Sequence, residues 1–529
     1  MLVAELLTPA RSGSTCTDAT QPLRSLQPFA GVCRTWRARS HHLHKTLSIS
    51  IRKPTSSQRS QHLFHVASTA PGVIYGVLPA RHVQGRTNLH LAKHPHTMWL
   101  EIDADVGPTM AMRVLQEIGF QGRMWEVRTL KCYVHHSVGG QYTWSRNQTS
   151  RAEQLFETVK RQLPELQQVE YQSAGPNSDI FPIYNGFRKV MTEPALTALT
   201  LDINGRLHDF AMLPLTTAAT LRSLVLNNIT LSGFLDAFVE ITHTHRRTRT
   251  LPVAVFAELE YLDIHLIHVS SPGGPALQRL DRLLQFPKLQ KLSLDPAIGR
   301  AVSLLPAFHA SPLHTLRLLN TDASLLPFDQ RDFPRLCSLD VALRYLPSHE
   351  LHTLEGLPQA LLAHSNLRHL RFSADIDFQV PQLFACMFLE HLELGATVAS
   401  DAATEIVGQL PFLKTLAYQI DAGRSGRRLA RQEVVEMVAG GLGSTPLNMR
   451  LQKLGVVAVC YAKNVPGTCF AEAAEVLRLA ARVPSLLCLE MGHGRVFGSL
   501  KVLRDALGDL VLARPAGHLQ HLEIKSICV

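Results

Sequence analysis

The sequence lacks an apolar run long enough to cross a membrane as a helix. Its longest apolar stretches, such as LGVVAVCYA at 454–462, are about half as long as a spanning helix needs to be. The start, MLVAELLTPARSGS, has no basic residue ahead of its apolar patch, so it does not have the form of a secretory signal. Charged residues are also few, at 18%, against 46% hydrophobic residues. This composition predicts an ordered protein rather than a disordered chain. We expect the protein in the cytoplasm or the nucleus.

Paired cysteine motifs are absent as well. Nine cysteines are scattered along 529 residues, and none forms a CxxC pair. An odd number without ligand spacing argues against a disulfide framework and against a zinc site. Cys337 and Cys488 lie inside apolar, strand-like segments. We therefore expect reduced cysteines that behave as small buried hydrophobes.

Acidic residues are scarce at one end only. Residues 1–100 hold 12 Lys and Arg against two Asp and Glu, whereas the other 429 residues hold 41 of each sign. A basic head on a neutral body is compatible with nucleic-acid binding or with an organellar transit segment. However, its basic residues do not alternate with aromatic residues that could stack on bases. We read the head as a solvated basic surface and expect neither nucleic acid nor membrane as a partner.

What the sequence has is a repeat of the form Leu-x-x-Leu-x-Leu, with aliphatic substitutes. Successive first positions, from Leu166 onward, lie 22 to 38 residues apart. The copies are VRTLKC at 127, LQQVEY at 166, LTALTL at 196, LRSLVL at 221, LEYLDI at 259, LQKLSL at 289, LHTLRL at 313, LCSLDV at 336, LRHLRF at 367, LEHLEL at 389, LKTLAY at 413, LQKLGV at 451, LLCLEM at 486 and LQHLEI at 519. So many copies in register indicate a repeat architecture.

Each copy is expected to form one strand. Alternation at Leu-x-Leu puts both side chains on one face, and the first Leu packs where the chain joins the strand. Amphipathic stretches between copies, such as 150–163, 278–286 and 471–483, predict helices. One strand and one helix cannot bury their apolar faces alone, so neighbouring units must stack.

In this respect the chain resembles a leucine-rich repeat protein. The resemblance implies an α/β solenoid, with a parallel strand ladder on the concave face and helices on the convex face. The solenoid is expected over 97–529, beginning with MWLEID and AMRVLQEIG, after a connecting region at 53–96. An all-helical repeat is the alternative, but it does not favour Leu-x-Leu alternation after a Pro or polar break.

A second pattern lies near the N-terminus, within residues 1–52. One apolar stripe at helical spacing is followed by arginines, and its members are Leu26, Phe29, Val32, Cys33 and Trp36. The run VCRTWR at 32–37 resembles the second half of an F-box, in the degenerate form found in fungi. The resemblance implies that these five residues bind a Skp-type adaptor of a cullin-type ubiquitin ligase, while the repeats bind a protein target.

A ligase-independent role for residues 1–52 stays open. A complete F-box opens with a Leu-Pro helix, whereas here MLVAELL is followed by the polar insert TPARSGSTCTDATQ. In the alternative, Phe29, Val32 and Trp36 form a cap on the first repeat, because terminal repeats need a cover over their apolar end.

Catalytic motifs are not evident, so we expect no enzyme, no cofactor and no metal. The glycine-rich run GHGRVFG at 492–498 follows a strand, but its spacing differs by one residue from a dinucleotide fingerprint. AGGLGST at 439–445 lacks the Lys of a phosphate loop. The 26 histidines include local clusters without acidic or cysteine companions at ligand spacing.

The residues between the repeat leucines are the candidate binding residues. If the leucines point inward, these residues line the concave face. The candidate target-binding residues are Arg317, His369, Arg371, His391, Glu393, His521 and Glu523. His369 and His391 occupy equivalent places on successive strands, so we expect them about 5 Å apart across the ladder.

Overall fold

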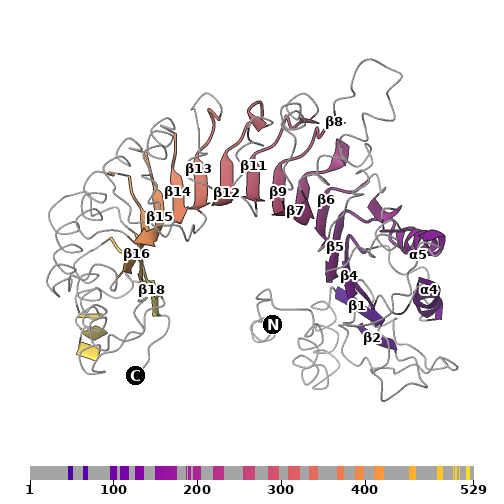
Figure 1. Ribbon diagram of the computed structural model, residues 1–529. Coiled ribbons are helices and arrows are strands. Elements are labelled where there is room, and N and C mark those ends of the chain that lie inside the picture. Colours follow the sequence, from indigo (N-terminus) through magenta and orange to yellow (C-terminus); the bar gives the residue numbers. More distant parts are fainter. Residues whose placement is uncertain are drawn as a thin grey trace. The chain divides into compact units, whose positions relative to one another are not determined.

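The computed structural model divides into two compact units, Met1–Lys288 (unit 1) and Leu289–Val529 (unit 2). Each is built on a ladder of strands that follows the chain order, except that β1 lies between β2 and β3 (Figure 1). The structure describes residues 46–51, 64–68, 96–103, 106, 108–117, 126–135, 149–174, 186–187, 189–191, 195–203, 219–230, 254–268, 284–296, 305, 308–321, 333–343, 366–373, 388–397, 410, 412–421, 452–459, 485–492, 504–505, 507–508, 511–512 and 520–524.

The main sheet of unit 1 runs in the order β2–β1–β3–β4–β5–β6–β7–β9. All of these neighbours are parallel except β2, which pairs antiparallel with β1. The strands are β1 (Thr46–Ile51), β2 (Phe64–Ser68), β3 (Thr97–Asp103), β4 (Thr129–His135), β5 (Gln168–Ala174), β6 (Ala198–Ile203), β7 (Ser223–Thr230) and β9 (Tyr261–His268). β8 (Ala254–Val255) and β10 (Leu284–Gln285) form a separate, two-stranded parallel sheet.

Unit 2 contains a second parallel ladder, in which each strand pairs with the next along the chain. Its strands are β11 (Lys291–Pro296), β12 (Thr315–Thr321), β13 (Ser338–Leu343), β14 (His369–Ser373), β15 (His391–Thr397), β16 (Thr415–Asp421), β17 (Lys453–Val459), β18 (Cys488–Gly492) and β19 (His521–Ile524). Every predicted copy of the repeat therefore forms a strand.

The repeat leucines stack in rows beneath each ladder. Leu370 and Leu392 are Cα partners, as are Leu392 and Leu416, and all three are at most 3% exposed. The first-position residues Leu367 and Leu389 are completely buried. Each such side chain contributes about 1.5–3 kcal/mol by leaving water. The predicted fold class, an α/β leucine-rich repeat, is confirmed by these rows.

Two described helices cover the leucine face of unit 1. They are α4 (Pro108–Glu117) and α5 (Thr149–Gln162), which lie side by side (Figure 1). Pro108 begins α4, where its missing N–H costs nothing. The buried Phe156 of α5 meets Phe187 edge-on, at 5.4 Å between ring centroids, and Phe187 packs against Tyr171 of β5 at 4.5 Å. The predicted helix at 150–163 is thus confirmed.

Gly186 allows a close approach of its segment to α5. A Cβ atom at this position would lie 2.6 Å from the carbonyl carbon of Ala152 and 2.7 Å from its oxygen. Backbone atoms cannot move aside as a flexible side chain can, so only glycine fits here.

Three expectations need adjustment. The ladder begins at β1, ahead of the expected boundary at residue 97, because TLSISI pairs in parallel with β3 and β2 covers its other edge. The stretch at 278–286 is not helical at its end, which forms β10. Cys337 and Cys488 are only partly buried because they lie at outward positions of the repeat. Cys132 is buried, and this burial raises the pKa of its thiol. All three cysteines are free thiols.

Some expectations fall outside the described residues. These are the helix at 471–483 and the adaptor-binding stripe from Leu26 to Trp36, so the F-box-like segment stays a prediction. None of the described helices is long and apolar enough to cross a membrane.

Candidate functional site

Each strand presents two residues on the face opposite the leucines. They occupy the third and fifth positions of the repeat, on either side of the buried fourth-position Leu. In β14 these are His369 and Arg371, both exposed, while Leu370 and Phe372 between and after them are buried. We call this side of each ladder the open face. Its side chains are held in cross-strand register by the backbone, so equivalent positions on neighbouring strands are direct neighbours.

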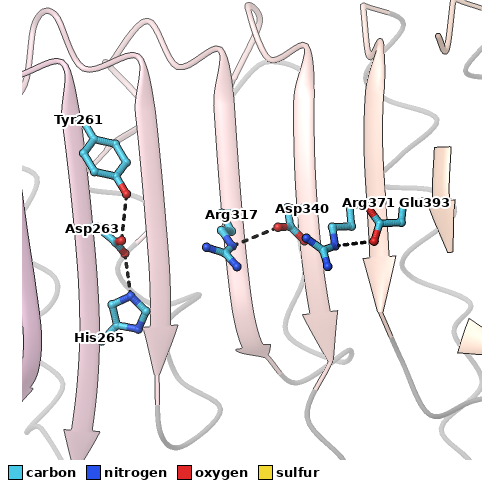
Figure 2. A network of polar contacts seen from close by, with 7 residues as sticks. All are labelled: Tyr261, Asp263, His265, Arg317, Asp340, Arg371 and Glu393. Carbon is cyan, nitrogen blue, oxygen red and sulfur yellow. Dashed lines mark hydrogen bonds and ion pairs between the residues drawn. The ribbon is translucent and has the colours of Figure 1, made fainter. Parts of the chain in front are cut away.

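Fifth-position charges on the open face of unit 2 form cross-strand ion pairs. Arg317 Nε lies 3.1 Å from Asp340 Oδ2 between β12 and β13. Arg371 Nε lies 3.2 Å from Glu393 Oε1 between β14 and β15. Figure 2 shows each arginine pointing along the row toward its carboxylate. Opposite charges thus occupy equivalent positions on paired strands, with both members at least partly exposed to solvent.

Two histidines stack beside these pairs. His369 and His391 are Cα partners at the third position, and their rings are nearly parallel at 4.3 Å between centroids. This confirms the expected neighbour relation. Burial of His391 lowers its pKa, and the positive charge that His369 carries when protonated lowers it further. The stack therefore disfavours simultaneous protonation of both rings. We call the six polar side chains at these positions of β12–β15 the polar cluster: Arg317, Asp340, His369, Arg371, His391 and Glu393.

A second row of charge runs along the second position of the repeat. Glu390 accepts hydrogen bonds from Arg368 Nη1 at 2.6 Å and from Lys414 Nζ at 2.5 Å. The hydrogen bond from Lys414, and then that from Arg368, lower the pKa of Glu390 to about 2. The backbone fixes this triad, because Glu390 N–H donates to the Arg368 carbonyl and Lys414 N–H donates to the Glu390 carbonyl, each at 2.8 Å.

The open face of unit 1 carries a different arrangement. On β9, the Tyr261 hydroxyl donates to Asp263 Oδ2 at 2.9 Å, and His265 Nε2 lies 3.1 Å from Asp263 Oδ1 (Figure 2). Asp263 is only 8% exposed, so these two side chains hold a nearly buried carboxylate. Lys131 and Glu170 form an ion pair between β4 and β5.

The structure brings most of the predicted target-binding residues together, but not all. Arg371, His369, His391 and Glu393 are contiguous on β14 and β15, and Arg317 lies two strands from β14. His521 and Glu523 lie on β19, four strands beyond β15, which is about 19 Å at normal strand spacing. They therefore belong to a different part of the ladder.

Sequence reasoning did not identify Asp340, which pairs with the predicted Arg317, or the triad of Arg368, Glu390 and Lys414. The triad lies at the second position of the repeat, away from the fourth-position Leu. The signal was present in the opposite charges at equivalent positions of consecutive copies, as in Arg368 and Glu390. Among the described residues, no three metal-ligating side chains gather, and the His369 and His391 rings stack rather than converge on a point.

The ladder and its repeat define a leucine-rich repeat fold. No family model matches the chain, and no curated protein matches it. Among solved structures, the chain is similar to an internalin from Listeria monocytogenes, with 13% identity, a TM-score of 0.35, and coverage of 74% of this chain and 96% of that chain. It is also similar to TLR13 in a complex with ssRNA13, with 11% identity, a TM-score of 0.31, and coverage of 77% and 61%. A third is mouse RP105 in a complex with MD-1, with 11% identity, a TM-score of 0.36, and coverage of 78% and 67%. The fold class rests on the strand ladder itself.

Proposed function

We propose that this protein is a non-enzymatic adaptor that captures a protein target on the open face of unit 2. The observation that carries the proposal is the polar cluster on β12–β15. Its arginines and carboxylates are already oriented by cross-strand pairs. Oriented charges lose little side-chain freedom on binding, and they select partners by complementary charge more than by buried area.

The leucine rows make such a surface tolerant of variation. Leu370 and Leu392 are buried on the opposite side of the ladder. The third- and fifth-position residues that flank each of them can therefore serve recognition. A rigid scaffold with exposed polar side chains at fixed spacing is what an extended protein-binding surface requires.

Charge reversal tests target capture. We expect Arg371→Glu to abolish co-purification of the bound target from native cells. The double variant Arg371→Glu with Glu393→Arg restores a pair but reverses its order, so it should also fail to capture the target. The matched control is Glu258→Lys, which breaks the exposed Glu258–Lys288 pair of unit 1 (2.7 Å) outside the cluster. Unchanged capture by both Arg371 variants would contradict the proposal.

We further propose that residues 1–52 dock a Skp-type adaptor and link the target to a cullin complex, in the cytoplasm or nucleus. Support comes from the F-box-like run VCRTWR at 32–37. The pairing of β2 along the outer edge of β1 also argues against a need for a further edge cap. The runner-up is a ligase-independent scaffold in which this stripe covers the first repeat.

The two roles are separated with a purified Skp-type adaptor. The test compares the full chain, the Trp36→Ala variant, and a chain that starts at residue 46 and so keeps β1. We expect adaptor binding by the full chain only, with target capture intact in all three. No adaptor binding by the full chain would support the scaffold instead.

A further inference from the structure

Unit 2 exposes two large aromatic side chains at one edge of its ladder. Phe388 is 48% exposed and Phe412 is 41% exposed, and their rings stack with 5.9 Å between centroids. Each lies directly before the first-position Leu of its repeat, where the chain turns into β15 or β16. We call Phe388 and Phe412 the phenylalanine pair. Single exposed apolar residues are common, but a contiguous pair marks a candidate contact surface.

No other copy of the repeat carries a large apolar residue at this place. The residues before the first position in the other copies are Glu126, Glu165, Ala195, Thr220, Glu258, Lys288, Pro312, Arg335, Asn366, Arg450, Ser485 and His518. The repeat architecture therefore does not require phenylalanine here. Because the two exceptions fall on adjacent strands, they form one patch rather than two scattered contacts.

The phenylalanine pair lies next to the Arg368–Glu390–Lys414 triad. Glu390 and Lys414 each follow a phenylalanine by two residues, so both groups share the same edge of β15 and β16. One carboxylate faces two cations, which leaves a net positive charge on the patch. Arg368 and Lys414 each give one hydrogen bond to Glu390 and carry further N–H donors. Their side chains are about half exposed.

We propose that the phenylalanine pair and the triad form a second docking surface, for an acidic peptide segment that carries a large apolar side chain. The apolar side chain packs on the two rings, and a neighbouring carboxylate of the partner takes the remaining donors of Arg368 or Lys414. Aromatic and arginine side chains are the residues that most often dominate binding energy at interfaces. This surface is additional to the target-binding role of the polar cluster.

An acidic peptide fits this patch better than a nucleic acid does. Phosphate binding favours a continuous basic track, whereas here Glu390 lies between the two cations. Unit 2 also has no excess of positive charge, with 23 Lys and Arg against 22 Asp and Glu over 289–529. Two stacked aromatic rings beside a triad with a net positive charge are complementary to a short acidic segment.

The first test uses a random dodecamer peptide library displayed on phage. The full chain serves as bait, and peptides that also bind the double variant Phe388→Ser with Phe412→Ser are removed. We expect the remaining peptides to be enriched in Asp or Glu next to an aromatic or large aliphatic residue. Enrichment of basic peptides, or no difference between the two baits, would overturn the proposal.

The second test measures one selected peptide by fluorescence anisotropy against the full chain. We expect Lys414→Glu and the double phenylalanine variant to weaken binding at least about tenfold, since each removes a central contact. Lys288→Glu, which reverses a lysine charge of unit 1 at the place before its first-position Leu, should bind as the parent does. Equal affinities for parent and Lys414→Glu would refute the charge assignment. Tighter binding of a twelve-residue uridine oligonucleotide than of the peptide would indicate a nucleic-acid surface instead. Target capture by Arg371→Glu is scored separately, so the two proposals can fail independently.

Discussion

The open faces of the two units differ although their leucine rows are alike. In unit 1, β5–β7 present Glu170, Thr200 and Val225 at the fifth position, and Glu170 pairs with Lys131 of β4. In unit 2, β12–β15 present arginines and carboxylates in alternation. The buried positions beneath both stretches are aliphatic or aromatic throughout. One side of each strand thus specifies the fold, and the other side varies without disturbing it.

This division predicts which substitutions cost stability and which cost binding. An inward side chain has close-packed neighbours on every side, whereas an outward one has solvent on at least one side. Substitutions on opposite sides of one strand should therefore give opposite results.

Leu392→Ala compared with Glu393→Ala gives the sharpest contrast. Leu392 is 1% exposed, so its truncation should reduce the free energy of unfolding by about 2–5 kcal/mol. Glu393 lies on the open face, and its replacement should change that free energy by about 0.5 kcal/mol or less. Urea unfolding followed by circular dichroism measures both. Equal losses in the two variants would show that the two sides of the strand are not independent.

Gly186→Ala tests the same idea at a closely packed position of unit 1. The new Cβ would meet the backbone of Ala152, so we expect a destabilisation of about 1–3 kcal/mol. Gly508→Ala is the matched control, because nothing lies within 4 Å of a Cβ atom there. The midpoint of thermal unfolding should fall for the first variant and stay unchanged for the second. A stable Gly186→Ala protein would mean that α5 can shift away from this segment.

The inward pattern was predictable from the sequence because it repeats. The pattern Leu-x-x-Leu-x-Leu predicts both the strand and the side of it that is buried. Each copy therefore predicted one strand, and His369 and His391 were predicted at equivalent positions of neighbouring strands. The ladder start was harder to predict, since TLSISI at 46–51 is a lone alternating segment without the first-position Leu. Its place depends on pairing with β2 and β3, which the repeat pattern does not indicate.

The outward pattern was predictable only in part. That Arg371 and Glu393 face the same side follows from alternation, but which charges pair depends on which copies are spatial neighbours and on side-chain reach. The Arg368–Glu390–Lys414 triad needs the second position to be outward as well, which the leucine pattern alone does not state. The phenylalanine pair was missed because apolar residues beside a leucine are normally read as core.

Acidification should reduce the free energy of unfolding of unit 2 through His391. Its pKa is lowered in the folded protein, first by burial and then by His369. An unfolded histidine takes up a proton near pH 6.5, so the unfolded state binds more protons below that value. This stabilising contribution is therefore present above about pH 6.5 and is lost as pH falls through the folded pKa.

His391→Gln should flatten the pH dependence relative to the parent. The measurement is the urea midpoint at pH 7.5 and at pH 5.5, with His265→Gln in unit 1 as the comparison, since its neighbour Asp263 is acidic rather than basic. We expect the loss between the two pH values to be smaller in His391→Gln than in the parent. Identical losses in parent and His391→Gln would assign the acid sensitivity to other histidines.

The smallest effects are expected from the cross-strand ion pairs themselves. Double-mutant cycles to alanine on Lys131–Glu170 in unit 1 and on Arg371–Glu393 in unit 2 should each give a coupling energy of about 0.2–1 kcal/mol. The Arg371–Glu393 value should be the lower, because half of each of its side chains is exposed, against about a third in the other pair. Both values should shrink in 1 M salt, where charges a few ångströms apart are screened. A large coupling in unit 2 would mean that its arginines and carboxylates serve the fold and are less available to a partner. A small one leaves their orientation useful for recognition, because a partner can replace these contacts at little cost.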